Sequence, residues 1–244
     1  ILAAQIKIKS GKIINFQHGG CYDNFDFDIG EIFEKKYSDK IYFWHQNDFI
    51  GNTYLPKINY LKKKEIKGNK ILILPTTKKF NDNIVTVVNR AHNLKYNPLY
   101  TFNFQFYNNL EQDLKNKTIV KLFPGDENKN IKKIWKLKTS NNVKIYSDGA
   151  FYKHKWFKDI RVVIMDDIST PLYETIYLNM PTILICEEFN EFNKKFKFFI
   201  AKLKKINFIF SKPNEASKFI NDNYDKIDIW WSKILKSSDF KNLR

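Results

Sequence analysis

The sequence predicts an α/β protein with a mostly parallel, Rossmann-like sheet. From residue 68 onward, short apolar runs rich in β-branched residues alternate with segments whose apolar residues recur at helical spacing. Short turns separate these segments, which favours strand–helix–strand units with parallel strands. Residues 1–67 hold fewer such units. We therefore divide the chain into a partial amino-terminal lobe (1–67) and a Rossmann-like domain with carboxyl-terminal helices (68–244).

The clearest unit contains two buried strands with a helix between them. Val162–Met165 and Thr182–Cys186 are short apolar runs that suit buried strands. Thr170 can cap the helix with its hydroxyl group, and Pro171 fits the first turn, where a missing N–H costs nothing. Asn179 and the proline that follows end the helical pattern. Ligands of such parallel units lie beyond the carboxyl ends of the strands.

The same patterns predict the other elements of the domain. Strands are expected at Ile71–Leu74, Ile119–Phe123, Val143–Tyr146 and Asn207–Phe210. Helices are expected at Thr101–Leu114, Ile131–Leu137, Gly149–Phe157, Phe189–Lys204, from Pro213 onward, and at Tyr224–Leu235.

The amino-terminal lobe is expected to be smaller. Lys12–Phe16 and Lys40–Trp44 are strand candidates, and Asn24–Lys36 reads as a loop that leads into a short helix. Ile1–Lys9 resembles the tail of a helix, so we expect that upstream sequence has been cut away. Residues 47–69 combine glycine, proline and a lysine run, which favours a linker between the two parts.

The charge of the chain is strongly positive but has little value as a sign of function. The 244 residues carry a net charge of +16, from 42 basic and 26 acidic residues. Only Arg90, Arg161 and Arg244 are arginines, although nucleic-acid surfaces commonly use arginine for bidentate contacts. A lysine-rich nucleic-acid-binding module therefore stays an alternative that is not favoured.

Cysteine usage and hydropathy favour a cytosolic protein. Cys21 and Cys186 belong to no CxxC pair, which indicates a reducing compartment. No segment reaches the roughly 18 continuous apolar residues of a membrane span, and the first residues hold no apolar run of signal-peptide length. Trp230 and Trp231 are expected to pack on a neighbouring domain, with contact to a membrane surface as the alternative.

The start of the helix at Thr170 is the first candidate site. A helix N-terminus offers unpaired N–H groups and a partial positive charge, and the hydroxyl groups of Ser169 and Thr170 add donors for a phosphate. Asp167 lies in the same loop. The carboxylate of Glu174, one turn later, could accept hydrogen bonds from ribose hydroxyls. The alternative is that Ser169 and Thr170 only cap the helix.

A second candidate site follows the first predicted strand. In Gln17-His18-Gly19-Gly20, the two glycines permit close approach of a ligand to the backbone, and His18 can donate to a phosphate or act as a base. The alternative is a tight turn with an incidental histidine.

Other motifs are weak or missing. Asp26-Phe27-Asp28 matches a metal-binding Asp-x-Asp signature, but it follows a glycine turn instead of an apolar strand, so no metal is assigned. Missing GxGxxG, GxxxxGK[ST], HExxH and GxSxG motifs make Rossmann dehydrogenases, P-loop NTPases, zincins and α/β-hydrolases poor candidates.

Six short motifs follow one another in a moderately specific order. They are Gln17-His18-Gly19-Gly20-x-Tyr22, the acidic Glu31 and Glu34, Ser38-Asp39 before an aromatic strand ending in Trp44, Asp167-x-Ser169-Thr170-x-x-x-Glu174, Asn179-x-Pro181-Thr182, and Trp230-Trp231. The combination, which spans nearly the whole chain, resembles a family of bacterial transferases from O-antigen and surface-polysaccharide loci. That family is similar to GT-B glycosyltransferases and, distantly, to glycerophosphotransferases that use CDP-glycerol.

The resemblance implies a donor-binding cleft between two Rossmann-like domains, the carboxyl-terminal one being GT-B-like. Ser169, Thr170 and Glu174 would hold the nucleotide, and the His18 loop would face the reacting group. We assign His18 as general base on the acceptor hydroxyl, with phosphate binding as its alternative role. No metal or cofactor is implied, since helix dipoles and side-chain donors would stabilise the departing phosphate.

The chain departs from the pattern of this family at two places. Phe123-Pro124-Gly125-Asp126 stands where related members have His-Pro-Arg, and Trp44-His45-Gln46 replaces Trp-Gly-Trp. A complete GT-B enzyme has two full nucleotide-fold domains, so this chain is expected to be a fragment or a reduced member.

The leading hypothesis is therefore a transferase that moves a sugar or polyol phosphate from a nucleotide-activated donor, such as a nucleotide-sugar or a CDP-polyol, to a cell-surface glycan. A noncatalytic nucleotide- or glycan-binding remnant is the alternative. The location expected is the cytoplasm, with peripheral association at the inner face of the cell membrane kept open.

Overall fold

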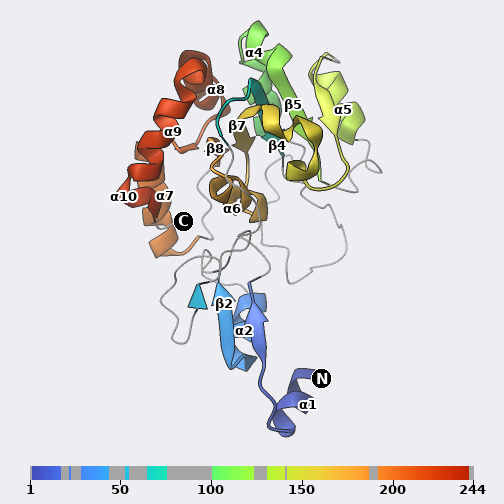
Figure 1. The fold of residues 1–244 in the computed structure, drawn as a ribbon, viewed down its shortest axis with the longest axis vertical. Helices are drawn as coiled ribbons and strands as arrows, with labels where there is room; N and C mark the ends of the chain where they lie inside the picture. Colours follow the sequence, from blue (N-terminus) through green and yellow to red (C-terminus); the bar gives the residue numbers. More distant parts are fainter. Residues whose placement is uncertain are drawn as a thin grey trace.

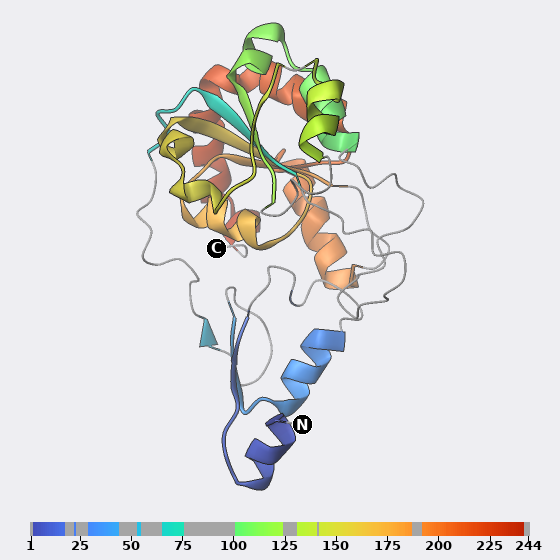
Figure 2. The same cartoon turned by 90° about the vertical axis from the view of Figure 1, so that its right-hand side faces the viewer.

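The chain forms two parallel sheets, a small one in the amino-terminal part and a large one after it. The computed structural model describes residues 2–17, 22, 29–43, 53–54, 65–75, 101–123, 131–140, 142–186 and 192–241. Figure 1 shows the two parts along the long axis of the molecule, and Figure 2 shows them from the side.

The large sheet has six strands, all parallel, in the order β6-β5-β4-β7-β8-β9. The strands are β4 (Lys70–Leu74), β5 (Thr118–Lys121), β6 (Lys144–Tyr146), β7 (Ile160–Met165), β8 (Thr182–Ile185) and β9 (Ile209–Phe210). The predicted Rossmann-like parallel sheet is confirmed. Because successive strands are added outward from β4 on one side and from β7 on the other, the strand order reverses between β4 and β7.

Helices cover both faces of this sheet (Figures 1 and 2). They are α3 (Thr101–Asn108), α4 (Gln112–Lys117), α5 (Ile131–Lys138), the 3-10 turns η2 (Phe151–Lys153) and η3 (Lys155–Asp159), α6 (Thr170–Tyr177), α7 (Lys194–Lys205), α8 (Pro213–Asn223), η4 (Tyr224–Lys226), α9 (Ile227–Lys236) and α10 (Ser238–Lys241).

The core lies on the two faces of the sheet because neighbouring strand residues point in opposite directions. In β7, Val162 and Ile164 pack with α3, α4, α5 and α8, whereas Val163 and Met165 pack with η2, α6, α7 and α9. Both sets are buried, which explains why the central strands read as continuous apolar runs instead of alternating ones.

Three predicted helices differ in detail from the observed ones. The helix expected over Thr101–Leu114 is broken into α3 and α4, since Glu111 has an extended backbone (φ −61°, ψ 152°). The segment Gly149–Phe157 forms two 3-10 turns, because His154 between them is extended (φ −80°, ψ 144°). Helix α7 begins only at Lys194, where Oδ1 of Asn193 accepts a hydrogen bond from a backbone N–H of the first turn.

Gly68 marks the entry into the large sheet. A Cβ atom at this position would lie 2.2 Å from the carbonyl oxygen of Asp159, at the start of β7. The next residue, Asn69, donates its N–H to the same oxygen at 2.8 Å. Only glycine allows β4 and β7 to start this close together, and Ile66 already packs against the core of the domain. The boundary between residues 67 and 68 stays a prediction.

The small sheet is also parallel, in the order β1-β2-β3. Its elements are α1 (Leu2–Ile8), β1 (Ile14–Phe16), α2 (Ile29–Tyr37), β2 (Lys40–Phe43) and β3 (Thr53–Tyr54). The strand β3 falls inside the segment that we had expected to be a linker. A small core of Tyr22, Ile41 and Phe43 lies on one face of the sheet.

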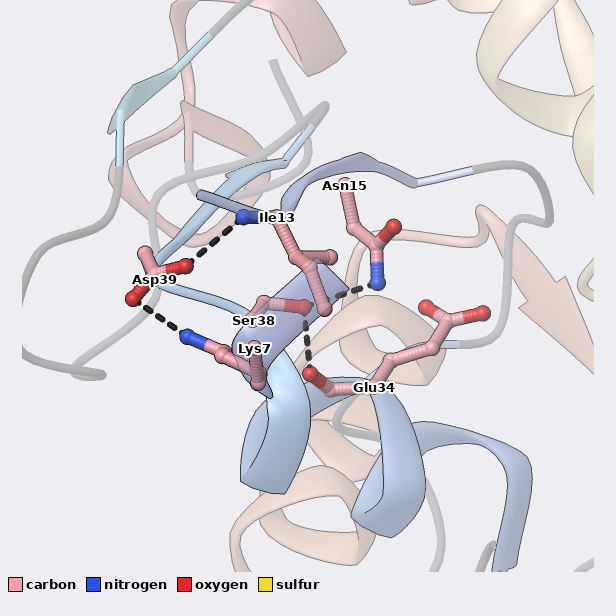
Figure 3. A network of polar contacts seen from close by, with 6 residues as sticks. All are labelled: Lys7, Ile13, Asn15, Glu34, Ser38 and Asp39. Atoms are coloured by element: carbon pink, nitrogen blue, oxygen red, sulfur yellow. Dashed lines mark hydrogen bonds and ion pairs between the residues drawn. The ribbon is translucent and has the colours of Figure 1, made fainter. Parts of the chain in front are cut away.

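A network of polar contacts holds α1, β1 and the start of β2 together (Figure 3). One carboxylate oxygen of Asp39 accepts from Nζ of Lys7 at 2.5 Å, and the other accepts from the N–H of Ile13 at 2.7 Å. The neighbouring Ser38 accepts from Nδ2 of Asn15 at 2.7 Å and donates to the carbonyl oxygen of Glu34. Ser38-Asp39 thus has a structural role in this lobe.

Candidate functional site

The loop between β7 and α6 contains or adjoins every site residue predicted in the large domain. Asp166 and Asp167 follow β7 and are half-buried, as is Ser169. Ile168 is 4% exposed and packs in the core, so one apolar side chain anchors the loop. Because the loop lies at the carboxyl end of a central strand, it occupies the edge where ligands of parallel sheets bind.

The start of α6 differs from the expectation in one respect. Ser169, rather than Thr170, takes the N-cap position, and its side chain forms no capping hydrogen bond. In the described part of the chain, the hydroxyl group of Thr170 likewise has no hydrogen-bond partner. The helix begins after Ser169, whose backbone is extended (φ −131°, ψ −179°), and no side-chain hydroxyl group of Ser169 caps it.

Several hydrogen-bond donors therefore remain at this helix start. Pro171 lies in the first turn and has no N–H, and the N–H of Leu172 donates to the carbonyl oxygen of Ser169 at 3.0 Å. The remaining donors are the hydroxyl groups of Ser169 and Thr170 and the N–H of Thr170, which can have no intrahelical partner. All of them lie at the positive end of the helix dipole.

Glu174 lies four residues after Thr170, so the two side chains project from the same side of α6. Both are half-buried, beside the buried face formed by Leu172, Thr175 and Ile176. Asp167 and Glu174 each interact with other residues of the chain, so a ligand would join existing contacts. The structure thus brings the predicted donor-binding residues together on one loop and one helical turn.

The far end of α6 is fixed by a left-handed residue. Asn179 has a φ of 61°. The N–H of Met180 donates to the carbonyl oxygen of Thr175 at 2.9 Å, and the N–H of Asn179 donates to the carbonyl oxygen of Ile176 at 3.0 Å. These two bonds form a Schellman motif, which confirms the predicted stop at Asn179. The orientation of α6 on the sheet is therefore set at both ends.

One contact at this edge could not be found from the sequence. Asn103, in the first turn of α3, is fully buried, and its Nδ2 donates to Oδ2 of Asp166 at 2.6 Å. The two residues are 63 positions apart, and neither belongs to a motif. Phe123, two residues after β5, is 61% exposed.

The second predicted site is only partly described. Gln17 directly follows β1, donates its N–H to the carbonyl oxygen of Tyr42 at 2.8 Å, and is 3% exposed. His18, Gly19 and Gly20 lie outside the described residues, as does the Asp-x-Asp triplet at 26–28. The catalytic role of His18, and the substrate-binding roles of Gln17 and the two glycines, therefore stay predictions.

The described ranges contain no group of three or more His, Cys, Asp or Glu side chains placed to hold a metal ion. In the same ranges, no helix combines the length and the apolar character needed to cross a membrane. Trp231 is fully buried and Trp230 packs edge-on against Phe219, so the tryptophan pair packs within its own domain and not on a neighbouring one, which corrects the expectation.

A six-stranded parallel sheet with a donor-rich helix start beside its strand reversal defines a Rossmann-like protein suited to a phosphate-bearing ligand. The chain belongs to the LIC12162 family of transferases, since the sequence model of that family matches residues 1–235.

The other two comparisons add less. No curated protein matches the chain. Among solved structures, one match is the crystal structure of accessory secretory proteins 1, 2 and 3 in Streptococcus pneumoniae, with a TM-score of 0.47 and 12% sequence identity. The match covers 86% of this chain and 40% of that chain, so this chain spans less than half of its length.

Proposed function

We propose that the chain is a GT-B-like transferase that moves a sugar or a polyol phosphate from a nucleotide-activated donor to a cell-surface glycan. Membership of a transferase family supports transfer chemistry. The donor, a nucleotide-sugar or a CDP-polyol, is a substrate, and the proposal requires no cofactor. The reaction would take place in the cytoplasm, at the inner face of the cell membrane, where such donors and acceptors would meet.

The observation that carries the proposal is the unused donor set at the start of α6. A serine at an N-cap commonly accepts a hydrogen bond from the first turn, which stabilises a helix by about 1 kcal/mol. Ser169 takes the N-cap position without forming this bond, and the hydroxyl group of Thr170 is equally unused in the described residues. Both hydroxyl groups can therefore donate to a phosphate beside the strand reversal.

The small lobe would supply the acceptor side of the reaction. Gln17 lies at the carboxyl end of β1 in a parallel sheet, so the loop that follows it leaves from a ligand-binding edge. In Figures 1 and 2, this lobe lies on the side of the large domain where α6 is found. We assign His18 as general base on the acceptor hydroxyl, with Gln17, Gly19 and Gly20 forming the substrate loop.

Calorimetric titration with CDP, UDP and GDP tests the donor site. The variant Ser169→Ala/Thr170→Ala should weaken binding of the preferred nucleotide about tenfold or more, because it removes two hydrogen bonds to a charged phosphate. Its melting temperature should stay close to that of the wild type, since neither hydroxyl group caps the helix. Ser232→Ala, at an exposed serine of α9, is the matched control and should bind normally.

Two results would refute the placement of this site. Either the wild type binds none of the three nucleotides, or the double variant binds as tightly as the wild type. Once a donor is known, His18→Ala should lower turnover by about 10²- to 10⁴-fold with little change in nucleotide affinity. A protein that binds nucleotides but transfers nothing would instead be the noncatalytic remnant.

A further inference from the structure

Asn103 and Asp166 form a pair at the strand reversal that the donor site described above does not use. Asn103 is fully buried in the first turn of α3, and its Nδ2 donates to Oδ2 of Asp166 at 2.6 Å. Such a short bond is typical of an amide donating to an ionised carboxylate. The pair joins a helix on one face of the sheet to the residue that directly follows β7.

Asn103 is a polar residue in a fully buried, largely apolar environment. Phe104, Phe106 and Tyr107 around it are buried apolar residues that pack in the core. The orientation of the amide is set by Asp166, because a carboxylate accepts from Nδ2 and would repel Oδ1. Oδ1 of Asn103 is consequently buried without a hydrogen-bond partner. Unsatisfied buried polar groups are rare in native proteins and occur preferentially where function requires them.

Asp166 lies between two helix starts. Helix α3 begins near it on one face of the sheet, and α6 begins four residues later on the other face. Both Asp166 and Asp167 precede the donors at Ser169 and Thr170 in the same loop. Two carboxylates would repel a phosphate, so the phosphate belongs at the start of α6 and an uncharged part of the ligand belongs beside Asp166.

We propose that Asp166 accepts hydrogen bonds from hydroxyl groups of the donor, and that Asn103 is a positioning residue that holds its carboxylate in place. An ionised carboxylate has about four acceptor sites and no donor, which suits the hydroxyl groups of a ribose or of a sugar or polyol. The bond from Asn103 helps to fix the direction of the carboxylate, and Asp166 has further interactions within the chain, so the hydroxyl groups of the ligand would join existing contacts. This inference rests on the proposed function and adds a hydroxyl-recognising part to the same site.

The test compares ligands with and without hydroxyl groups on one protein. Inorganic pyrophosphate, CDP, UDP, CDP-glycerol and UDP-glucose would be titrated into wild type, Asn103→Ala and Asp166→Asn. Both variants should weaken binding of the hydroxyl-bearing ligands on the order of tenfold, the effect of one hydrogen bond to a charged group. Pyrophosphate should bind Asn103→Ala like wild type and Asp166→Asn at least as tightly, since that variant removes a negative charge near the phosphate. This binding also shows that the variants are folded. Gln105→Ala, at an exposed residue of α3, is the matched control and should change neither affinity.

The pattern of losses identifies the hydroxyl groups. If the variants weaken CDP and CDP-glycerol equally, Asp166 binds the ribose. If they weaken only CDP-glycerol or UDP-glucose, it binds the transferred group. The inference fails if the variants bind the hydroxyl-bearing ligands normally, or if pyrophosphate weakens by the same factor, since Asp166 would then act only through the loop. A wild type that binds none of these ligands would instead overturn the proposed function.

Discussion

The indole Nε1 of Trp231, on α9, donates a hydrogen bond of 3.1 Å to Oδ1 of Asn179, at the end of α6. Trp231 is fully buried, so this bond satisfies a donor that water does not reach. Asn179 thus has two roles, since it also adopts the left-handed conformation that ends the helix.

Substitutions at Asn179 should separate these two roles. Asn179→Gly keeps the left-handed conformation but leaves the indole unpaired, which should cost about 1–3 kcal/mol of unfolding free energy. Asn179→Ala adds the strain of a left-handed alanine, about 1–2 kcal/mol more. Asn207→Ala is the control, because Asn207 ends α7 with φ 58° and is exposed. Urea denaturation measures all three, and equal losses for Asn179→Ala and Asn207→Ala would contradict a contribution from the indole bond.

Gly68→Ala should destabilise the large domain by about 3 kcal/mol or more, at the upper end of what overpacking costs. The added Cβ would lie 2.2–2.3 Å from the carbonyl group of Asp159. Because this carbonyl group belongs to the backbone, it cannot move aside as a flexible side chain could. Gly149→Ala is the control, since a Cβ there meets nothing within 4 Å and only the left-handed φ of 57° opposes it. Thermal denaturation should show a clearly larger drop in melting temperature for Gly68→Ala. A similar drop for both variants would mean that β4 and β7 can separate without cost.

Tyr224→Phe should be neutral or stabilising by up to about 1 kcal/mol at pH 7, since the phenol hydroxyl is buried without a partner. Burial raises the pKa of Tyr224 to about 12, although the positive charge of Arg161 lowers this pKa in part. Because the unfolded phenol ionises near pH 10, wild type should lose about 1.4 kcal/mol per pH unit between pH 10 and about 12 from this group. Urea denaturation at pH 8 and pH 11 should show a smaller alkaline loss for Tyr224→Phe than for wild type. Tyr37→Phe, at an exposed tyrosine, should behave like wild type.

Asp39 should titrate in the folded lobe below its usual pKa of 3.8, chiefly because it accepts a hydrogen bond from Lys7 and further because it accepts one from the N–H of Ile13. A lowered pKa means that this carboxylate stabilises the lobe above its ordinary pKa and that the contribution is lost as the pH falls through the lowered value. The amide resonance of Ile13 should report the titration. Lys7→Ala should raise the pH midpoint of this titration, and Lys12→Ala should raise it less. An unchanged midpoint in Lys7→Ala would show that the hydrogen bond from Lys7 does not lower the pKa of Asp39.

Local patterns were enough to find most of the elements. The runs of β-branched residues in β4, β7 and β8 are buried strands, and Pro171 and Asn179 bracket α6 as expected. These signals are local because they come from side-chain size and from backbone conformations available to single residues. The very short β3 and the break between α3 and α4 gave no such signal, since each depends on one or two residues.

The candidate site was harder to predict because its geometry depends on contacts between distant residues. The loop from Asp167 to Thr170 was found from its sequence, but which residue takes the N-cap was not, since serine and threonine are both good caps. The contact between Asn103 and Asp166 follows from the placement of α3 beside β7, which no motif encodes. The reversal of strand order, which locates the ligand-binding edge, likewise appears only when all six strands are placed.

The close start of β4 and β7 also has a consequence for how the chain folds. The ion pair between Lys70, the first residue of β4, and Asp159, the residue before β7, links residues 89 positions apart. One edge of β4 therefore stays open during synthesis until β7 has left the ribosome. Closing so long a loop is slow, and the apolar residues of β4 remain accessible to other chains in the meantime. Nascent chains that stop short of β7 should therefore aggregate or bind chaperones, whereas chains that include it can complete the centre of the sheet.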